Sequence, residues 1–182
     1  MTFKENASNE LLTVLPADEK GILAFLCAAA KQAGSINICA KRKNLVFALS
    51  SYAECLAVVD MLKTLYPTEF EISMEHVKSG SRKGSTSYSV AVPTGFTKQA
   101  LSDLHLVSDD GKEDESVIPD FVTENRALAL SYLKGLFMVC GSVYVPSHGE
   151  DDEKREGYHF EFMVEDEQSA QETVSYTHLT LP

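Results

Sequence analysis

Apolar residues recur at helical spacing near the start of the chain. A helix is predicted over 18–33, because five apolar side chains fall on one of its faces. A shorter helix is predicted over 9–15, just before Pro16. The apolar face of the longer helix consists of Ile22, Leu26, Ala29, Ala30 and Ala33.

The following stretch has the pattern of a hairpin and then returns to the helical period. A hairpin is predicted over 35–49, and it leads into a helix that begins after Ser51 and stops at Pro67. Ser51 and Glu54 have the spacing of a capping box, in which each side chain bonds the other residue's backbone N–H. The apolar stripe of this helix consists of Cys55, Val59, Leu62 and Tyr66.

A second hairpin is predicted over 69–77 and 85–92. Apolar side chains alternate with polar ones from Phe70 to Met74, which is the period of a half-buried strand. A short helix over 97–105 and a linker over 107–119 follow. The next helix is predicted to begin near Asp120, and its apolar stripe consists of Leu128, Tyr132, Gly135, Leu136 and Val139.

Two apolar helical segments, 107 positions apart, end in the same way. Residues 26–36 read LCAAAKQAGSI, and residues 133–143 read LKGLFMVCGSV. Small residues allow close helix packing, and a glycine just past a helix end is expected to be left-handed. The pattern predicts two copies of one unit, packed helix against helix about a pseudo-twofold axis. The alternative is a chance recurrence of helix, hairpin and helix, which many α+β proteins contain.

Charge is distributed unevenly along the chain, whose net charge is −11. Residues 1–100 contain 11 Lys and Arg against 9 Asp and Glu, whereas residues 101–182 contain 5 against 18. The acidic excess is concentrated in 109–115 and 150–156, which have the character of solvated loops. Because such runs repel a phosphate backbone, any nucleic-acid face is expected in the first half or in the groove between the copies.

The cysteines do not have the spacing of a metal site. Cys27, Cys39, Cys55 and Cys140 fit no CxxC pattern, so they are interpreted as reduced, mostly buried thiols of a cytosolic protein. There is no apolar run of 18 residues, so neither a signal peptide nor a membrane span is expected. No cofactor, metal or small-molecule substrate is predicted.

The second repeated helix resembles a known motif. Residues 133–141 align position for position with the LAGLIDADG motif of homing endonucleases, and their surroundings resemble its degenerate form in the WhiA family. WhiA proteins are bacterial regulators of sporulation and cell division. The resemblance covers roughly 1–173 and includes Gly34-Ser35 and the helix ending at Tyr66. It implies an α+β fold in which the two motif helices pack centrally and two sheets form a saddle over DNA.

The resemblance also implies the position of a lost active site. Active enzymes of the nuclease family carry an acidic residue at the eighth motif position of each copy, where it holds Mg²⁺. Ala33 and Cys140 occupy these positions here. A methyl group or a thiol does not replace a carboxylate as a Mg²⁺ ligand, so no catalysis is expected. The expected core of the motif helices consists of Leu26, Ala30, Gly34, Leu133, Gly135, Leu136 and Gly141.

The leading functional hypothesis is therefore DNA binding without chemistry. Basic residues at two predicted hairpin tips are candidates for phosphate contacts, although such tips are often simply polar. Full-length relatives add a helix-turn-helix domain, which is the better candidate for reading sequence and which nothing in this chain matches. The alternative function is a protein-interaction module that contacts another regulator, and an active endonuclease ranks last. The candidate DNA contacts are Lys41, Arg42, Lys43, Lys78, Arg82 and Lys83.

Four segments are expected along the chain. A first repeat with an N-terminal helix covers 1–106, and an acidic linker covers 107–119. A second repeat over 120–173 is expected to be incomplete, because it lacks a second hairpin. Residues 174–182 break the helical pattern and resemble adapter DNA read through as protein, so this tail is interpreted as non-native rather than as an ordinary tail. A bacterial cytoplasmic location is expected, at the nucleoid in a full-length protein.

Overall fold

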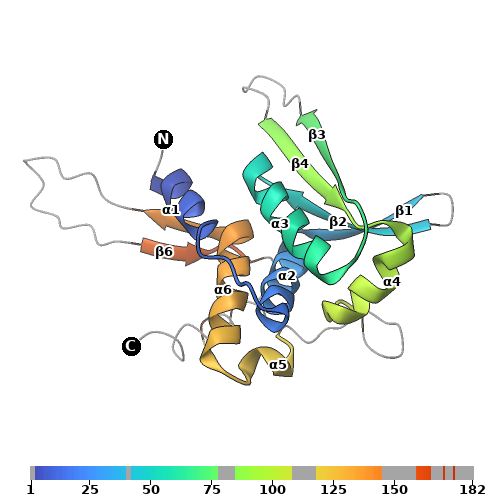
Figure 1. Cartoon of the computed structure of the whole chain (residues 1–182). Helices are drawn as coiled ribbons and strands as arrows, with labels where there is room; N and C mark the ends of the chain where they lie inside the picture. Colours follow the sequence, from blue (N-terminus) through green and yellow to red (C-terminus); the bar gives the residue numbers. More distant parts are fainter. Residues whose placement is uncertain are drawn as a thin grey trace, which may run out of the picture.

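Two long helices pack side by side at the centre of the molecule. These are α2 (Glu19–Ala33) and α6 (Arg126–Cys140). Figure 1 shows a four-stranded sheet on one side of the pair and a two-stranded sheet on the other. The predicted fold, a duplicated α+β unit built on two motif helices, is confirmed. The computed structural model describes residues 3–39, 42–77, 85–107, 118–144, 159–164, 170 and 174.

The larger sheet is antiparallel and has the strand order β1-β2-β4-β3. The two predicted hairpins supply one pair of strands each, and β2 and β4 join them in the middle. The outermost strands, β1 and β3, form the two edges. The strands are β1 (Gly34–Cys39), β2 (Arg42–Leu49), β3 (Glu71–Val77) and β4 (Ser85–Ala91).

One face of this sheet is buried by helices. Phe47 of β2 and Val90 of β4 are direct partners in the sheet, and both are fully buried. Successive side chains of a strand point to opposite faces of the sheet. The face that carries Phe47 and Val90 is called the helix face, and the opposite face is called the outer face. Each large side chain on the helix face contributes about 1.5–3 kcal/mol by burial. Helices α2, α3 (Tyr52–Leu65) and α4 (Thr94–Asp103) cover the helix face.

Helix α2 is buried on two sides and not along a single stripe. Ile22, Phe25 and Leu26 belong to the core beneath the larger sheet. Ala24 and Cys27 belong to a second core, which α2 shares with α6. The predicted single face was therefore incomplete, because a helix between two layers is apolar all round.

The predicted helix over 9–15 was wrong in its position. The observed helix α1 is Phe3–Leu11, and the chain then leaves the helix through two turns. Pro16 disfavours a helical conformation at Leu15 by steric contact, so the helix is not expected to reach residue 15 as predicted. The observed helix is mostly polar, so the apolar pattern gave no signal for its start.

Two further helix boundaries also differ from prediction. Helix α4 begins at Thr94 and not at residue 97, because Pro93 has the φ of −56° that suits the residue before a first turn. The helix expected from Asp120 is split into a short α5 (Asp120–Thr123) and α6. Asn125 separates them: its backbone is extended, and its side chain caps α6.

The second repeat is described as far as its first hairpin. Strands β5 (Gly141–Tyr144) and β6 (His159–Phe162) are antiparallel. Phe160 is 57% exposed although its ring stacks on that of Phe137, with centroids 5.3 Å apart. The acidic runs 109–115 and 150–156, and the tail after Val174, lie outside the described residues. Within the described part of the chain, no helix is long and apolar enough to cross a membrane.

Candidate nucleic-acid interface

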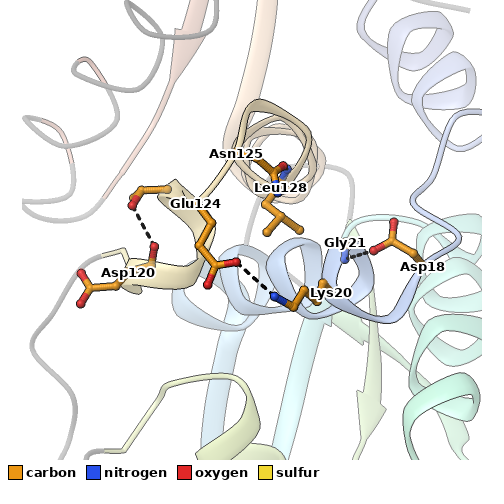
Figure 2. A network of polar contacts seen from close by, with 8 residues as sticks. Asp18, Lys20, Gly21, Asp120, Glu124, Asn125 and Leu128 are labelled. Carbon is orange, nitrogen blue, oxygen red and sulfur yellow. Dashed lines mark hydrogen bonds and ion pairs between the residues drawn. The ribbon is translucent and has the colours of Figure 1, made fainter.

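The two central helices begin at equivalent capping residues. Asp18 Oδ1 accepts the Gly21 N–H at 2.9 Å, and Asn125 Oδ1 accepts the Leu128 N–H at 3.0 Å. The two caps are 107 positions apart, like the helices that they begin. Figure 2 shows the two ends joined by Lys20, whose Nζ lies 3.1 Å from Glu124 Oε2. An ion pair between two exposed side chains thus links the helix starts, at the end of the pair away from the strands.

The backbones of the two helices meet where Gly135 lies against Phe25. A Cβ atom at Gly135 would collide with the Phe25 carbonyl oxygen and lie 2.9 Å from the carbonyl carbon. Ala28, at the equivalent position of α2, is fully buried. Small residues at this motif position thus set how closely the pair packs.

The glycines at the helix ends do not adopt the predicted left-handed conformation. Gly34 has φ −84° and ψ 144°, and Gly141 has φ −76° and ψ 146°, so neither is left-handed. Each donates its N–H to the carbonyl four residues earlier and passes straight into a strand. A Cβ at Gly34 would collide with the Ala30 carbonyl, and one at Gly141 would collide with Phe137. Glycine is therefore required for space at the sharp helix-to-strand junction and not for a positive φ.

The eighth motif positions lie at these same C-terminal ends. Ala33 and Cys140 are both partly buried, and each precedes its junction glycine. The Cys140 thiol donates to the Leu136 carbonyl at 3.2 Å. Among the described residues there is no group of three or more His, Cys, Asp or Glu side chains that could hold a metal ion. The two helix ends thus carry a methyl group and a thiol at the positions where the resemblance to the nucleases implies carboxylates in active enzymes.

The remaining motif-helix residues lie mostly in the core. Leu26, Ala30 and Leu136 are at most 3% exposed, and Gly135 and Gly141 are also buried. Gly34 and Leu133 are only partly buried. The motif residues at the centre of the pair are thus packed most tightly.

The outer face of the larger sheet is made of small and polar residues. The strand register places Ser35 and Asn37 of β1 beside Val46 and Asn44 of β2 on this face. Asn44 Oδ1 accepts the Thr94 hydroxyl at 2.7 Å, which fixes the direction of its amide. The other outer-face positions are Ala48, Glu71, Ser73, Glu75, Ser87, Ser89 and Ala91.

The basic residues predicted at the first hairpin tip do not share one face. Arg42 pairs with Cys39 at an outer-face position, whereas Lys43 pairs with Ile38 on the helix face. Lys43 is exposed there. The other four candidates, Lys41, Lys78, Arg82 and Lys83, lie outside the described residues.

The outer faces carry carboxylates that the sequence did not predict near the candidate DNA contact. Glu71 and Glu75 are exposed at outer-face positions of β3. Glu161 is exposed on the corresponding face of the smaller sheet, opposite the stacked Phe160. The alternation in 69–77 already places Glu71 and Glu75 on one side of the strand, but the strand order is needed to show which side that is.

A small cavity lies between the end of β2 and the C-terminal part of α6. It has a volume of about 240 Å³ and is lined by Ala48, Leu49, Ser50, Glu54 and Val139. Glu54 is only 4% exposed, and it completes the predicted capping box by accepting the Ser51 N–H at 3.2 Å. The same carboxylate also accepts the N–H and the hydroxyl of Ser50. The buried charge is thus held by hydrogen bonds at the start of α3.

Cys55, the residue after Glu54, is fully buried. Burial, with a contribution from the Glu54 charge, raises the pKa of its thiol from 9.0 to about 11. The thiol is protonated at neutral pH, which fits a packing residue and not a nucleophile.

Comparisons with known proteins fit this geometry. No protein-family model matches the chain. It is 32% identical over 146 residues to the probable cell division protein WhiA of Pediococcus pentosaceus, a match that covers 80% of this chain and 46% of that protein. The WhiA of Alkaliphilus metalliredigens is 25% identical over 169 residues, which is 90% of this chain and 50% of that protein.

Solved structures show the same fold. The full-length DUF199/WhiA of Thermotoga maritima superposes with a TM-score of 0.60 at 24% identity, over 100% of this chain and 50% of that one. The N-terminal LAGLIDADG domain of DUF199/WhiA gives a TM-score of 0.59 at 23% identity, over 99% and 73% of the two chains. The chain is thus similar to WhiA proteins over 80–90% of its own length. It spans about half the length of the WhiA proteins that it matches, and its fold is that of their LAGLIDADG-like domain.

Proposed function

We propose that this chain is the non-catalytic, DNA-contacting part of a WhiA-type regulator of transcription in cell division and sporulation. The observation that carries the proposal is the pair Ala33 and Cys140 at the C-terminal ends of the packed motif helices. In the nuclease family these ends hold the metal and face the DNA. A scaffold that keeps the helix pair and replaces both acids is suited to holding DNA without cutting it.

The proposed DNA contact lies along the outer face of the larger sheet. Exposed Asn37 and the Ser residues of β3 and β4 offer hydrogen bonds to phosphates or base edges, and Arg42 stands where the sheet ends. Glu71 and Glu75 oppose a phosphate backbone at the far edge. The proposed affinity is therefore low and depends on salt. In the longer WhiA proteins, the family's helix-turn-helix domain is proposed to read the sequence, at the bacterial nucleoid.

Binding of duplex DNA as a function of salt tests the proposal. Fluorescence anisotropy gives the slope of log affinity against log salt, whose magnitude falls by about 0.9 for each phosphate that the protein no longer neutralises. Arg42→Ala removes the basic residue at the β2 position that pairs with Cys39, and Lys43→Ala removes its sequence neighbour, which pairs with Ile38 on the helix face. We expect the slope to fall in Arg42→Ala and to stay unchanged in Lys43→Ala.

A variant that removes a negative charge, instead of a positive one, provides a second test of contact through the outer face. Glu75→Gln removes a negative charge from the outer face without changing the size of the side chain. Its DNA affinity should rise if the duplex lies along this face. Equal losses in Arg42→Ala and Lys43→Ala, with no change in Glu75→Gln, would contradict contact through the outer face.

A protein-interaction module is the second candidate, and the outer-face carboxylates favour it. Glu71, Glu75 and Glu161 give the described outer faces an acidic character, which suits a basic partner protein better than a duplex. On this alternative the chain does not bind DNA at low salt. The unsubstituted chain in the anisotropy titration therefore distinguishes the two candidates.

A further inference from the structure

The two edges of the larger sheet are built differently. Edge strands expose unpaired backbone N–H and C=O groups, and soluble proteins protect them with charges, prolines or bulges. On β3 the sequence places Glu71, Glu75 and His76 along the edge, and all three are exposed. These carboxylates disfavour the approach of another strand, so the β3 edge is protected.

The β1 edge has none of these protections. Its six residues, GSINIC, include no charged residue and no proline. Its pairing with β2 is continuous from Gly34–Phe47 to Cys39–Arg42, so it contains no bulge. Ile36 is 38% exposed and Ile38 is 68% exposed, so the described residues leave this edge uncovered. A bare strand with two exposed isoleucines is suited to pairing.

The sequence of β1 is complementary to itself in the antiparallel direction. A twofold axis through Asn37 would pair Asn37 with its own copy and Ile36 with Ile38 of the second chain. Paired residues on antiparallel strands share a face, so all four isoleucines would lie together on the helix face. A register shifted by one residue would place isoleucine opposite asparagine, on the wrong face. A register shifted by two residues keeps the isoleucines on the helix face but pairs only one isoleucine of each copy with an isoleucine, so the register centred on Asn37 is favoured.

We propose that two copies of this chain associate through their β1 edges, in antiparallel register centred on Asn37. Alternate residues of β1 direct their backbone groups away from β2, and these groups would bond the second copy. The contact is isologous and closed by its twofold axis, so it gives a dimer and not a fibre. It joins two four-stranded sheets into one of eight strands. The proposal is independent of DNA binding, because it uses the strand edge and the isoleucines of the helix face.

Mass measurement with a matched pair of variants tests the association. The full chain is expected to show a monomer–dimer equilibrium in light scattering after size-exclusion chromatography, with the mean mass rising with concentration. Ile38→Lys places a charge in the middle of the contact and should shift the chain to monomer. Met74→Lys is the control, since Met74 is 56% exposed on the same face of β3, at the opposite edge. It should leave the dimer unchanged.

A cross-link tests the register. In a Cys39→Ser background, Asn37→Cys should form a disulfide between copies, because directly paired strand residues lie within the Cα separation that a disulfide needs. Ser73→Cys in the same background is the control, on the same outer face at the β3 edge. A monomeric mass at every concentration, or equal cross-linking of the two variants, would overturn the proposal. The cross-link also decides the matter if Ile38→Lys does not fold.

Discussion

The two motif helices, α2 and α6, have the same length and equivalent caps but differ in how deeply they are buried. Helix α2 lies between the two cores and is buried from Gly21 to Ala30 with Leu23 alone partly open. Helix α6 packs mainly in the second core, and its residues Arg126, Ala127 and Leu130 are exposed. The comparison shows that a duplicated unit keeps its caps, length and junction glycines while the burial of the copies diverges. What is kept is the geometry that joins the copies.

The largest effect is expected at the helix crossing. Gly135→Val inserts a branched side chain where even a Cβ meets the Phe25 carbonyl, so the helices must separate. We expect the free energy of unfolding to fall by about 3 kcal/mol or more. Urea denaturation measures this loss. At the equivalent position, Ala28→Gly should cost only about 1 kcal/mol from helix propensity. A loss in Gly135→Val no larger than that in Ala28→Gly would contradict the close contact of Gly135 with the Phe25 backbone.

The next largest loss of stability is expected at alkaline pH, from a buried thiol of the first repeat. The pKa of Cys55 is about 11 in the folded chain and 9.0 when unperturbed, so the unfolded chain loses this proton first. The raised pKa of Cys55 stabilises the folded chain below pH 9, by on the order of 2 kcal/mol. This contribution to the free energy of unfolding is lost as pH rises to about 11. Tyr66, whose pKa is also raised by burial and by Asp103, adds to the loss above pH 10. Denaturation from pH 8 to 11 should show a smaller decrease in Cys55→Ala than in the original chain.

The helix caps test the equivalence of the two copies. Asp18→Ala and Asn125→Ala each remove a side chain that accepts one N–H of the first turn. Each should destabilise the chain by about 1 kcal/mol, because the donor loses its partner. Thermal denaturation of the two variants gives the comparison. Asp18→Asn is the control, since it keeps the capping oxygen and should cost little. A large loss in one cap alone would indicate that the copies are not equivalent at this end.

The smallest effect is expected at the ion pair that joins the two helix starts. Lys20 and Glu124 are 66% and 52% exposed, so water and salt screen the attraction. A double-mutant cycle with Lys20→Ala and Glu124→Ala should give a coupling of about 0.2–1 kcal/mol that shrinks with added salt. A coupling well above this range, or one that salt does not change, would contradict the account of an exposed pair.

The sequence predicted the parts of the fold that local patterns determine. The 107-residue offset predicted both motif helices, and the spacing of Ser51 and Glu54 predicted a capping box that is present. The split between α5 and α6 was missed: Asn125 is a residue type preferred at N-caps and precedes an apolar helical run, but the start of the helix was assigned to Asp120.

Features that depend on distant contacts could not be predicted. His105 has a φ of 50°, which usually favours glycine, and its ring stacks on Phe121 with centroids 5.3 Å apart. That partner lies in the second repeat and has no signal near residue 105. In the candidate interface, Arg42 and Lys43 were predicted as one basic tip, but only the strand register showed that they lie on opposite faces.

The central claim is that the helix pair serves to hold DNA without cutting it. The direct measurement is to incubate the chain with supercoiled plasmid and Mg²⁺ at low salt and to follow binding and nicking in the same samples. We expect a retarded plasmid that stays supercoiled, with retardation lost as salt is raised. Nicking or linearisation that requires Mg²⁺ and this chain would contradict binding without cleavage, since Ala33 and Cys140 offer no carboxylate to the metal.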